Sequence, residues 1–381
     1  MKRVIILGAS GSIGLSTCKV ARQFPDRMKI VGLAVQRSVP ALLEQVREFG
    51  PRAVAVYDPA AAQEAKAALP SNCRLFQGPQ GLVDLVRETD ADMVLVAIVG
   101  TAGLAPALAA LETGKELAVA SKEILVMAGE AVTAAAKRYG HAILPVDSEH
   151  NAIFQCLLNT PVEQVKRLIL TASGGPFRTT PKPELAHVTV EQALKHPTWD
   201  MGKKITIDSA TLFNKGLEMI EARWLFGVGM EKIDVIVHPQ SLVHSMVEFV
   251  DHSVLAQLSH SDMCFPIQYA ITYPERLPNQ LPSLDFSKLG QLIFEAPDPG
   301  RFPALRLARQ AGSIGGTLPA VFNAANEVAV ERFLSRKASF PQIWESVEKV
   351  MDQHRSIASP DLDAILQADT WARQTAGHIL N

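Results

Sequence analysis

Short hydrophobic runs alternate with amphipathic or alanine-rich stretches in the first part of the chain. The runs lie at residues 4–7, 29–35, 53–56, 93–98, 116–119 and 142–144, and the clearest helical stretches between them at 12–23, 39–49 and 123–138. Strands that alternate with helices in this way form a parallel sheet with helices on both faces. The pattern therefore predicts an α/β fold that begins with a Rossmann-type domain.

The pattern changes after Asp147. Further strands are predicted at 165–171, 233–237, 243–250 and 254–258, and the alternation at 245–249 indicates a sheet with one covered face. A proline-rich connector over 274–299 leads to helical segments at 304–310, 319–333, 340–352 and 360–379. We expect a Rossmann-type domain over 1–146, a central α+β domain over 147–280, a linker over 281–300 and a small C-terminal helical domain over 301–381.

The uncharged stretch from residue 93 to residue 111 approaches the length of a membrane-spanning helix. Gly100, Gly103 and Pro106 interrupt it, and its first residues form the continuous apolar run of a strand buried on both faces. We therefore predict a strand, a loop and a helix there, and no membrane partner.

Composition narrows the class of protein. Hydrophobic residues make up 48% and charged residues 20% of the 381 residues, and the net charge of -2 comes without a basic stripe, so nucleic acid is not an expected partner. The four cysteines, Cys18, Cys73, Cys156 and Cys264, are scattered, which indicates reduced cytoplasmic thiols and neither a zinc site nor a disulfide framework.

A glycine-rich loop follows the first strand directly. Residues 8–14 read Gly-Ala-Ser-Gly-Ser-Ile-Gly and open a predicted helix, where glycines let a backbone approach a pyrophosphate at the helix N-terminus. The spacing is a variant of the usual dinucleotide fingerprint, so a glycine-rich turn without a ligand is the alternative.

The end of the second strand bears on which dinucleotide would bind. NAD-binding folds usually place an acid there, whereas this chain has Gln36, Arg37 and Ser38. Arg37 could pair with a 2′-phosphate, which favours NADP over NAD. An ordinary surface arginine is the alternative.

Three carboxylates are candidates for a metal site. Asp147 and Glu149 follow the last Rossmann strand, and in an extended segment their side chains would point to the same side. Glu218 shares a predicted helix turn with Asn214 and Lys215. Together the acids suit a hard divalent cation; a surface loop and an ordinary surface salt bridge are the alternatives.

Two loops and a segment with hydroxyl groups complete the candidate chemistry. The loop at 173–176 (Ser-Gly-Gly-Pro) and the segment 208–211 near a helix start offer N–H and hydroxyl donors to an anion. The segment 196–202 is bounded by proline and glycine and carries His196, Trp199 and Met201, which suits a mobile lid. A structural loop with Trp199 in the core is the alternative.

These segments together resemble the 1-deoxy-D-xylulose 5-phosphate reductoisomerase family. The resemblance rests on the glycine loop at 8–14 and on the segments 145–151 (Pro-Val-Asp-Ser-Glu-His-Asn), 173–177, 196–202, 214–218 (Asn-Lys-Gly-Leu-Glu) and 238–241 (His-Pro-Gln-Ser). They occur in order over essentially the whole chain.

The resemblance implies a function and a set of site residues. It implies a homodimer that uses NADPH and one Mg²⁺ or Mn²⁺ per subunit to rearrange 1-deoxy-D-xylulose 5-phosphate by retro-aldol cleavage and re-addition, followed by reduction to 2-C-methyl-D-erythritol 4-phosphate. The implied metal ligands are Asp147, Glu149 and Glu218. The implied phosphate ligands are Ser173, Ser209, Asn214 and Lys215; Lys122, Ser148 and His196 would contact the carbon skeleton, and Trp199 and Met201 would close the lid. The implied cofactor contacts are Gly8, Ser10, Gly11, Ser12, Ile13, Gln36, Arg37, Ser38, Ser121, Glu123 and Gly202.

Three positions depart from the family pattern. Ser38 and Ser121 stand where asparagine is usual, and Ser261 where proline is usual. The first two fall in the implied cofactor site, so the departures bear on the contacts to NADPH rather than on the metal and phosphate residues.

Two other classes of function share part of this pattern. A semialdehyde dehydrogenase would have a similar glycine loop but needs a nucleophilic cysteine, and Cys156 lies in an apolar helical run that does not favour a thiolate. A dinucleotide-sensing protein without activity would leave the three acids without a role.

Overall fold

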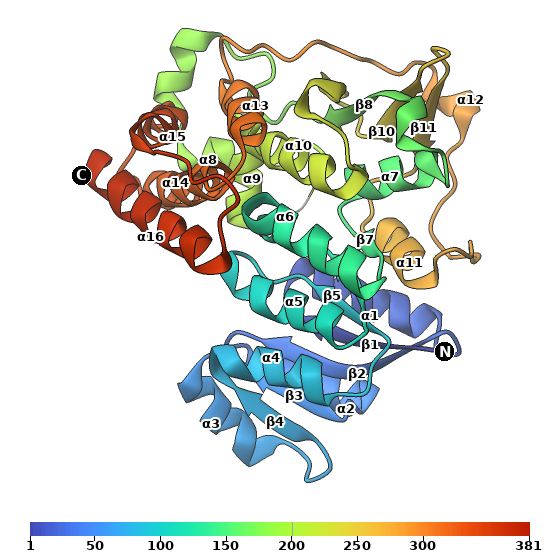
Figure 1. The fold of residues 1–381 in the computed structure, drawn as a ribbon. Coiled ribbons are helices and arrows are strands. Elements are labelled where there is room, and N and C mark those ends of the chain that lie inside the picture. The colour runs from blue at the N-terminus through green and yellow to red at the C-terminus, as the bar shows by residue number, and fades with distance from the viewer. Residues whose placement is uncertain (200) are drawn as a thin grey trace. The chain divides into compact units, whose positions relative to one another are not determined.

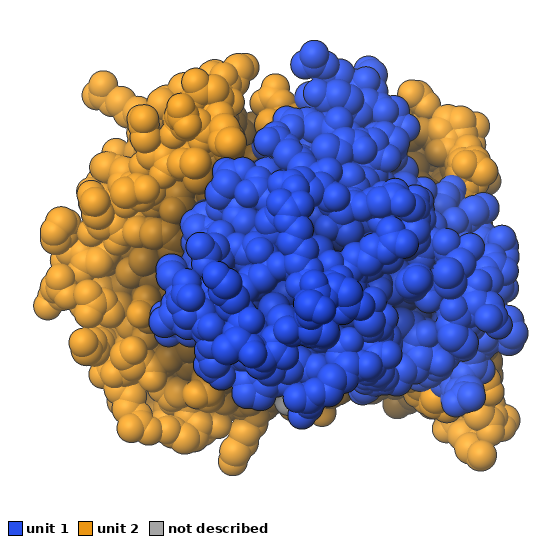
Figure 2. Space-filling model, turned by 90° about the horizontal axis from the view of Figure 1, so that it is seen from below, with its two compact units in different colours: residues 1–124, 132–151, 262–281 blue, residues 125–131, 152–261, 282–381 orange. Residues whose placement is uncertain are grey.

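The chain divides into two compact units, which Figure 2 distinguishes by colour. The computed structural model describes residues 1–199 and 201–381. The first unit comprises Met1–Ile124, Val132–Asn151 and Asp262–Leu281, and the second comprises Leu125–Ala131, Ala152–Ser261 and Pro282–Asn381. Each unit is thus built from segments that are far apart in the sequence.

A seven-stranded parallel sheet forms the centre of the first unit (Figure 1). Its strands are β1 (Lys2–Leu7), β2 (Met28–Val35), β3 (Ala53–Val56), β4 (Arg74–Gln77), β5 (Met93–Val96), β6 (Glu116–Val119) and β7 (Ile143–Pro145), in the order β4-β3-β2-β1-β5-β6-β7. The strand order reverses at β1, which pairs with both β2 and β5. The predicted Rossmann-type sheet is confirmed, and the carboxyl ends of β1 and β5 are where such sheets bind ligands.

The helices around this sheet begin and end at residues with clear local reasons. Asp58 caps α3 by accepting hydrogen bonds from two backbone N–H groups, and α2 and α6 end at Gly50 and Gly140, whose φ angles of 58° and 73° lie in the left-handed region. The helical elements are α1 (Ser12–Gln23), α2 (Val39–Phe49), α3 (Pro59–Ala68), α4 (Gly78–Glu88), η1 (Thr101–Gly103), α5 (Leu104–Glu112), α6 (Lys122–Tyr139) and α11 (Cys264–Thr272).

The apolar stretch at 93–111 forms β5, a 3₁₀ turn and α5, as predicted. Within the described residues, no helix has the length and hydropathy needed to cross a membrane. The prediction missed β4, because this edge strand is only four residues long and places polar Arg74 and Gln77 in solvent.

A four-stranded sheet belongs to the second unit. Its strands are β8 (Val165–Ala172), β9 (Ile233–Val237), β10 (Val243–Phe249) and β11 (Val254–Leu258), in the order β11-β10-β8-β9. β10 runs antiparallel to β11 and β8, whereas β8 and β9 are parallel. The helical elements of this region are α7 (Ser148–Leu157), η2 (Val162–Gln164), η3 (Lys182–His187), α8 (Val190–Ala193), α9 (Lys203–Thr211), α10 (Phe213–Phe226) and η4 (Met230–Lys232). All four predicted strands are present.

The C-terminal helices share a hydrophobic core with this sheet. They are α13 (Ala304–Ile314), α14 (Leu318–Leu334), α15 (Gln342–Gln353) and α16 (Leu362–Ile379), and Figure 1 shows α14 and α16 side by side. The short α12 (Phe286–Leu289), which precedes them, buries none of its residues. Phe213 of α10 stacks on Phe322 of α14 with ring centroids 5.2 Å apart, inside one continuous cluster of buried side chains. α14 is therefore packed directly against the helix that carries Asn214, Lys215 and Glu218. The domain boundaries given above stay a prediction.

Candidate active site

The glycine loop lies at the carboxyl end of β1, beside the end of β5. Gly8 has a φ angle of 95°, and a Cβ atom there would lie 2.3 Å from the Ala97 carbonyl oxygen. A Cβ atom on Gly14 would lie 2.4 Å from the Gly8 carbonyl oxygen, whereas one on Gly11 would meet nothing closer than 3.4 Å. Gly8 and Gly14 are therefore required by the packing of the loop itself. Gly11 caps α1 and leaves its surface open to a ligand.

Arg37 lies at the end of β2 and is bonded to an acid that the sequence analysis did not single out. Its Nε donates to Asp58 Oδ2 at 2.8 Å, while the Arg37 side chain stays 75% exposed. Asp58 follows β3 and caps α3, and the backbone N–H groups of α3 together with Arg37 hold its pKa below the usual range. Asp58 thus holds Arg37 through Nε, while most of the Arg37 side chain stays exposed to solvent.

The serines predicted at the cofactor site have distinct surroundings. Ser38 follows Arg37 in the sequence and occupies the N-cap position of α2. It is exposed, and its hydroxyl makes no capping hydrogen bond. Ser121 is buried at the start of α6, where its hydroxyl donates to the Ile98 carbonyl at 2.6 Å. Ser121 therefore ties the start of α6 to the loop after β5. Ser10 lies in the glycine loop, and Ser12 and Ile13 form the first turn of α1.

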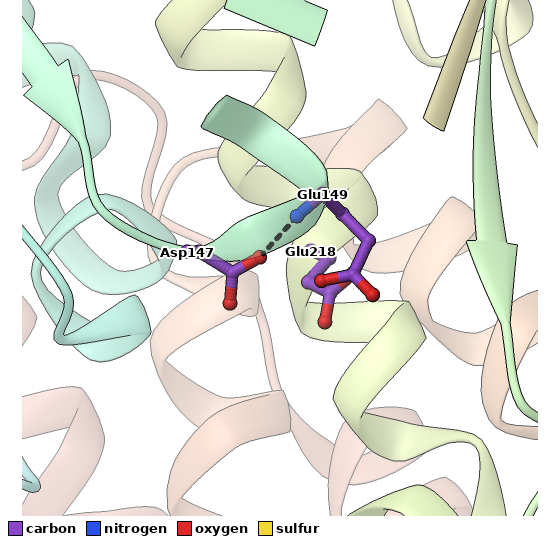
Figure 3. Close-up of side chains that lie close together, drawn as sticks. All are labelled: Asp147, Glu149 and Glu218. Carbon is purple, nitrogen blue, oxygen red and sulfur yellow. Dashed lines mark hydrogen bonds between the residues drawn. The ribbon is translucent and has the colours of Figure 1, made fainter. Parts of the chain in front are cut away.

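The structure brings the three predicted acids together. One carboxylate oxygen from each of Asp147, Glu149 and Glu218 lies within 4.8 Å of the others, and Figure 3 shows the three side chains turned toward one another. Glu218 is fully buried, and the other two are half-buried. Burial of this kind excludes the alternative of an ordinary exposed loop or surface salt bridge.

The expected extended conformation of residues 147–149 is wrong. Ser148 begins α7, and Glu149 lies in the first helical turn. The Glu149 N–H donates to Asp147 Oδ1 at 3.2 Å, and the Asn151 N–H donates to the Asp147 carbonyl at 2.8 Å, so Asp147 starts the helix. Asp147 and Glu149 therefore converge through a helix start, where the positive end of the helix dipole also favours carboxylates.

Each acid has at least one polar partner close by. Lys122 forms an ion pair with Asp147, and Lys215 forms one with Glu218. The Asn214 amide donates to Glu218 Oε1 at 2.6 Å, and the Ser148 hydroxyl donates to Glu149 Oε2 at 2.7 Å. Two of the three acids thus pair with a lysine and the third accepts from a hydroxyl group, which offsets part of the cost of burying the charges.

His196 joins the two serines predicted to bind phosphate. Its Nε2 lies 3.0 Å from the hydroxyl oxygens of both Ser173 and Ser209. Its Nδ1 accepts hydrogen bonds from the backbone N–H groups of Trp199 at 2.9 Å and Thr198 at 3.2 Å. Because Nδ1 accepts, the neutral ring carries its proton on Nε2 and donates it to one of the two hydroxyls.

Burial lowers the pKa of His196 to about 4. The ring is therefore neutral at neutral pH and acts as an oriented hydrogen-bond donor rather than as a cation.

The predicted lid contains no helix or strand between α8 and α9 in the residues that are described. Trp199 is half-buried and its ring lies 6.3 Å from that of His244, so it is not part of the core. Met201 precedes Gly202, which occupies the N-cap position of α9. Asp200 of the same motif lies outside the described residues.

Cys156 lies buried in α7, and all four cysteines are buried and form no disulfide within the described part of the chain. A buried thiol in an apolar helix does not provide the accessible nucleophile that a semialdehyde dehydrogenase requires.

The set of expected site residues omitted His150. This residue is fully buried, and its Nδ1 lies 3.4 Å from Asp147 Oδ1. The segment 145–151 had been singled out, so the motif itself was the available signal; only the structure shows that its histidine faces Asp147.

Comparisons with known proteins agree along the whole chain. Family models match residues 4–129 (1-deoxy-D-xylulose 5-phosphate reductoisomerase), 143–226 (its C-terminal domain) and 258–375 (DXP reductoisomerase C-terminal domain). The reductoisomerase of Anaeromyxobacter dehalogenans is 54% identical over 99% of this chain and 96% of its own, and that of Chlorobium limicola is 51% identical over the full length of both.

Solved structures of such enzymes have the same fold. The reductoisomerase from Zymomonas mobilis in complex with NADPH superposes with a TM-score of 0.94 at 44% identity, covering 100% of this chain and 99% of that one. A reductoisomerase in complex with NADPH, fosmidomycin and magnesium gives 0.92 at 40% identity, covering 100% and 98%. With the family models and these relatives in agreement, the chain belongs to the 1-deoxy-D-xylulose 5-phosphate reductoisomerase family.

Proposed function

We propose that this protein converts 1-deoxy-D-xylulose 5-phosphate to 2-C-methyl-D-erythritol 4-phosphate with NADPH and a divalent metal ion. The observation that carries the proposal is the convergence of Asp147, Glu149 and Glu218 within 4.8 Å. A dinucleotide-sensing protein would have no use for three gathered acids, and family membership gives no support to a semialdehyde dehydrogenase.

The donor set fits magnesium or manganese. Asp147, Glu149 and Glu218 would hold the ion through carboxylate oxygens, which these hard cations prefer. The three gathered residues include neither the cysteine nor the histidine ligands that favour zinc. A bound ion would act as a Lewis acid on oxygens of the substrate. His150 would orient the Asp147 carboxylate through the contact between its Nδ1 and Asp147 Oδ1.

The residues around the acids would bind the sugar phosphate. Lys215 and Asn214 both bond to Glu218. If Glu218 bound the metal ion, their N–H groups would be available to the phosphate. Ser173 and Ser209 would add hydroxyl donors oriented by His196. Hydrogen bonds to a phosphate are charge-assisted and therefore strong.

The remaining contacts concern the carbon skeleton and the lid. Lys122 and Ser148, beside Asp147 and Glu149, would contact the skeleton together with His196. Trp199 and Met201 would cover the bound substrate and exclude water.

The glycine loop and the end of β2 would bind NADPH. Gly11 at the start of α1 offers the pyrophosphate a helix N-terminus, and Arg37 keeps an exposed guanidinium for the 2′-phosphate. Gly8, Ser10, Ser12 and Ile13 belong to the same loop, and Gln36, Ser38, Ser121, Glu123 and Gly202 complete the proposed contacts. A homodimer and a cytoplasmic location are part of the proposal on the strength of the resemblance.

The test replaces each acid by its amide and follows NADPH absorbance with 1-deoxy-D-xylulose 5-phosphate. Asp147→Asn, Glu149→Gln and Glu218→Gln each remove a strong oxygen ligand with little change in size. We expect each variant to fold and to lose activity by roughly 100-fold or more, the scale of losing one electrostatic group from a preorganised site.

Exposed Glu163→Gln serves as the control and should keep full activity. Wild-type turnover should stop with EDTA, return with Mn²⁺ and resist thiol-blocking reagents. A Glu218→Gln enzyme with full activity would contradict the three-acid site, and inhibition by thiol blocking without EDTA sensitivity would favour the dehydrogenase.

A further inference from the structure

The second unit buries Asp208, an aspartate that the proposed function does not use. Asp208, in α9, is 1% exposed. Its Oδ1 accepts a hydrogen bond from Asn326 Nδ2 at 2.8 Å, and its Oδ2 pairs with Lys204 Nζ at 2.6 Å. Burying a carboxylate costs free energy unless each of its oxygens has a hydrogen-bond or ion-pair partner. The bond from Asn326 therefore offsets part of the cost of burying Asp208.

Asn326 comes from the C-terminal helix α14 and is fully buried. Its amide N–H₂ group faces Asp208, while its Oδ1 has no hydrogen-bond partner among the described residues. A buried carbonyl without a partner costs free energy, and an apolar side chain would fill this place in the core at lower cost. The hydrogen bond from Asn326 to Asp208 therefore explains an asparagine at this position better than core stability does.

Asp208 directly precedes Ser209, whose hydroxyl lies 3.0 Å from His196 Nε2. The helix that carries both, α9, is rich in β-branched residues (Ile205, Thr206, Ile207 and Thr211), which have low helix propensity. Its direction therefore depends on contacts made by its side chains. A bond that fixes Asp208 also fixes the neighbouring Ser209.

We infer that Asn326 is a positioning residue for the substrate site: through Asp208 it sets α9, and thereby places the Ser209 hydroxyl against His196. The inference rests on the proposed function for the identity of the substrate. It gives the C-terminal helices a specific part in the site although α14 supplies no proposed ligand.

The first test compares Asn326→Ala with Asn323→Ala. Asn323 lies one turn earlier on α14, is equally buried and also has a carbonyl oxygen without a partner, but its amide donates to Glu327 at 2.9 Å and not to Asp208. Asn326→Ala should raise KM for 1-deoxy-D-xylulose 5-phosphate about tenfold with a smaller change in kcat, because phosphate binding is lost in ground and transition states alike.

Asn323→Ala should lower the melting temperature to a similar degree and leave KM within about twofold, the change expected where no binding contact is lost. Equal effects of the two variants on KM would overturn the positioning role and leave only a contribution to core stability.

A swap of the two side chains tests the bond itself. Asn326→Asp alone places two carboxylates in contact, whereas Asp208→Asn combined with Asn326→Asp restores a donor and an acceptor with their places exchanged. We expect the single variant to bind substrate weakly and the double variant to recover most of the loss. A folded double variant, judged by circular dichroism, that binds no better than the single one would contradict the inference.

A third measurement does not depend on the reaction. In ligand-free protein with labelled histidine, the ring signal of His196, assigned from its absence in His196→Asn, should move in Asn326→Ala and stay in Asn323→Ala. If wild type fails to turn over the substrate, the proposed function is wrong, and this signal still decides the positioning role. An unmoved His196 signal in folded Asn326→Ala would overturn it.

Discussion

Protonation at single residues in the site is fixed by neighbours that are close in space. His196 Nδ1 accepts two backbone N–H bonds, and two serine hydroxyls lie 3.0 Å from its Nε2, so its tautomer follows from geometry. Lys122 and Lys215 each form an ion pair with one of the three acids. Hydrogen bonds and ion pairs among the site's own residues thus fix the positions of these side chains, and a site held in this way binds at a lower entropic cost.

The lowered pKa of His196 predicts how stability depends on pH. Above the usual value of 6.5 the ring is neutral in both states, and its contribution to stability is complete. As the pH falls from 6.5 toward about 4, the unfolded chain gains a proton that folded His196 does not accept, so stability is lost. Burial shifts the pKa of His354 in the same direction, so the loss is shared.

The measurement is the melting temperature of wild type and His196→Asn across that pH range. The variant should lose less stability than wild type on acidification, whereas exposed His187→Asn should follow wild type. Parallel curves for wild type and His196→Asn would show that His196 does not take part.

Arg37 makes a separate prediction about the cofactor. Arg37→Ala should raise KM for NADPH about tenfold and change KM for NADH little, because only the 2′-phosphate would form a charge-assisted bond with the guanidinium. Arg47→Ala, also exposed and in the last turn of α2, is the matched control. The same increase for both cofactors would argue that Arg37 acts only by holding Asp58.

Whole elements followed the sequence pattern closely where periodicity was strong. The predicted bounds of α1, α2, β3, β6, β9 and β11 agree with the structure, because apolar strand runs and amphipathic helices bounded by glycine or polar residues leave few alternatives. The short edge strand β4 and the start of α7 were missed or wrong. Pairing with the neighbouring strand β3 defines β4, and the Asp147 cap defines the start of α7. Periodicity along the sequence shows neither contact.

The sequence alone predicted the three acids of the candidate site, but it predicted fewer of the residues that contact and position the site residues. Asp147, Glu149 and Glu218 were found by residue type and motif. Asp58, His150 and Asn326 were not, because their roles come from contacts between segments that are far apart or from burial of a side chain. Spacing along the chain carries no information about the burial of His150 or about the contacts that Asp58 and Asn326 make with Arg37 and Asp208.

The segment 196–202 makes a prediction about motion at the scale of one element. It has no regular secondary structure among the residues described, and its exposed backbone is only partly held by His196. With NADPH, Mg²⁺ and a phosphonate analogue of the substrate added, hydrogen exchange in this segment should slow markedly, because closure protects its N–H groups. Exchange in β8 (Val165–Ala172), already bonded on both sides, should stay the same. Unchanged exchange in 196–202 would rule out closure as a lid.

At the scale of the whole molecule, metal binding should be visible as stability. An ion that binds only the folded chain stabilises it by about 2.7 kcal/mol when free ion reaches about 100 times its Kd. Mn²⁺ should therefore raise the melting temperature of wild type, and raise it less in each of Asp147→Asn, Glu149→Gln and Glu218→Gln.

The same variants should differ from one another when no metal is present. Glu218→Gln removes the ion pair with buried Lys215, so this variant should melt below metal-free wild type. Glu149→Gln removes one of three gathered negative charges and keeps a hydroxyl partner in Ser148, so it should melt at or slightly above wild type. Calorimetry in EDTA and then in Mn²⁺ separates the two effects within one set of samples. If all three variants melted alike in EDTA and gained as much from Mn²⁺ as wild type, the acids would be a structural cluster and the ion would bind elsewhere.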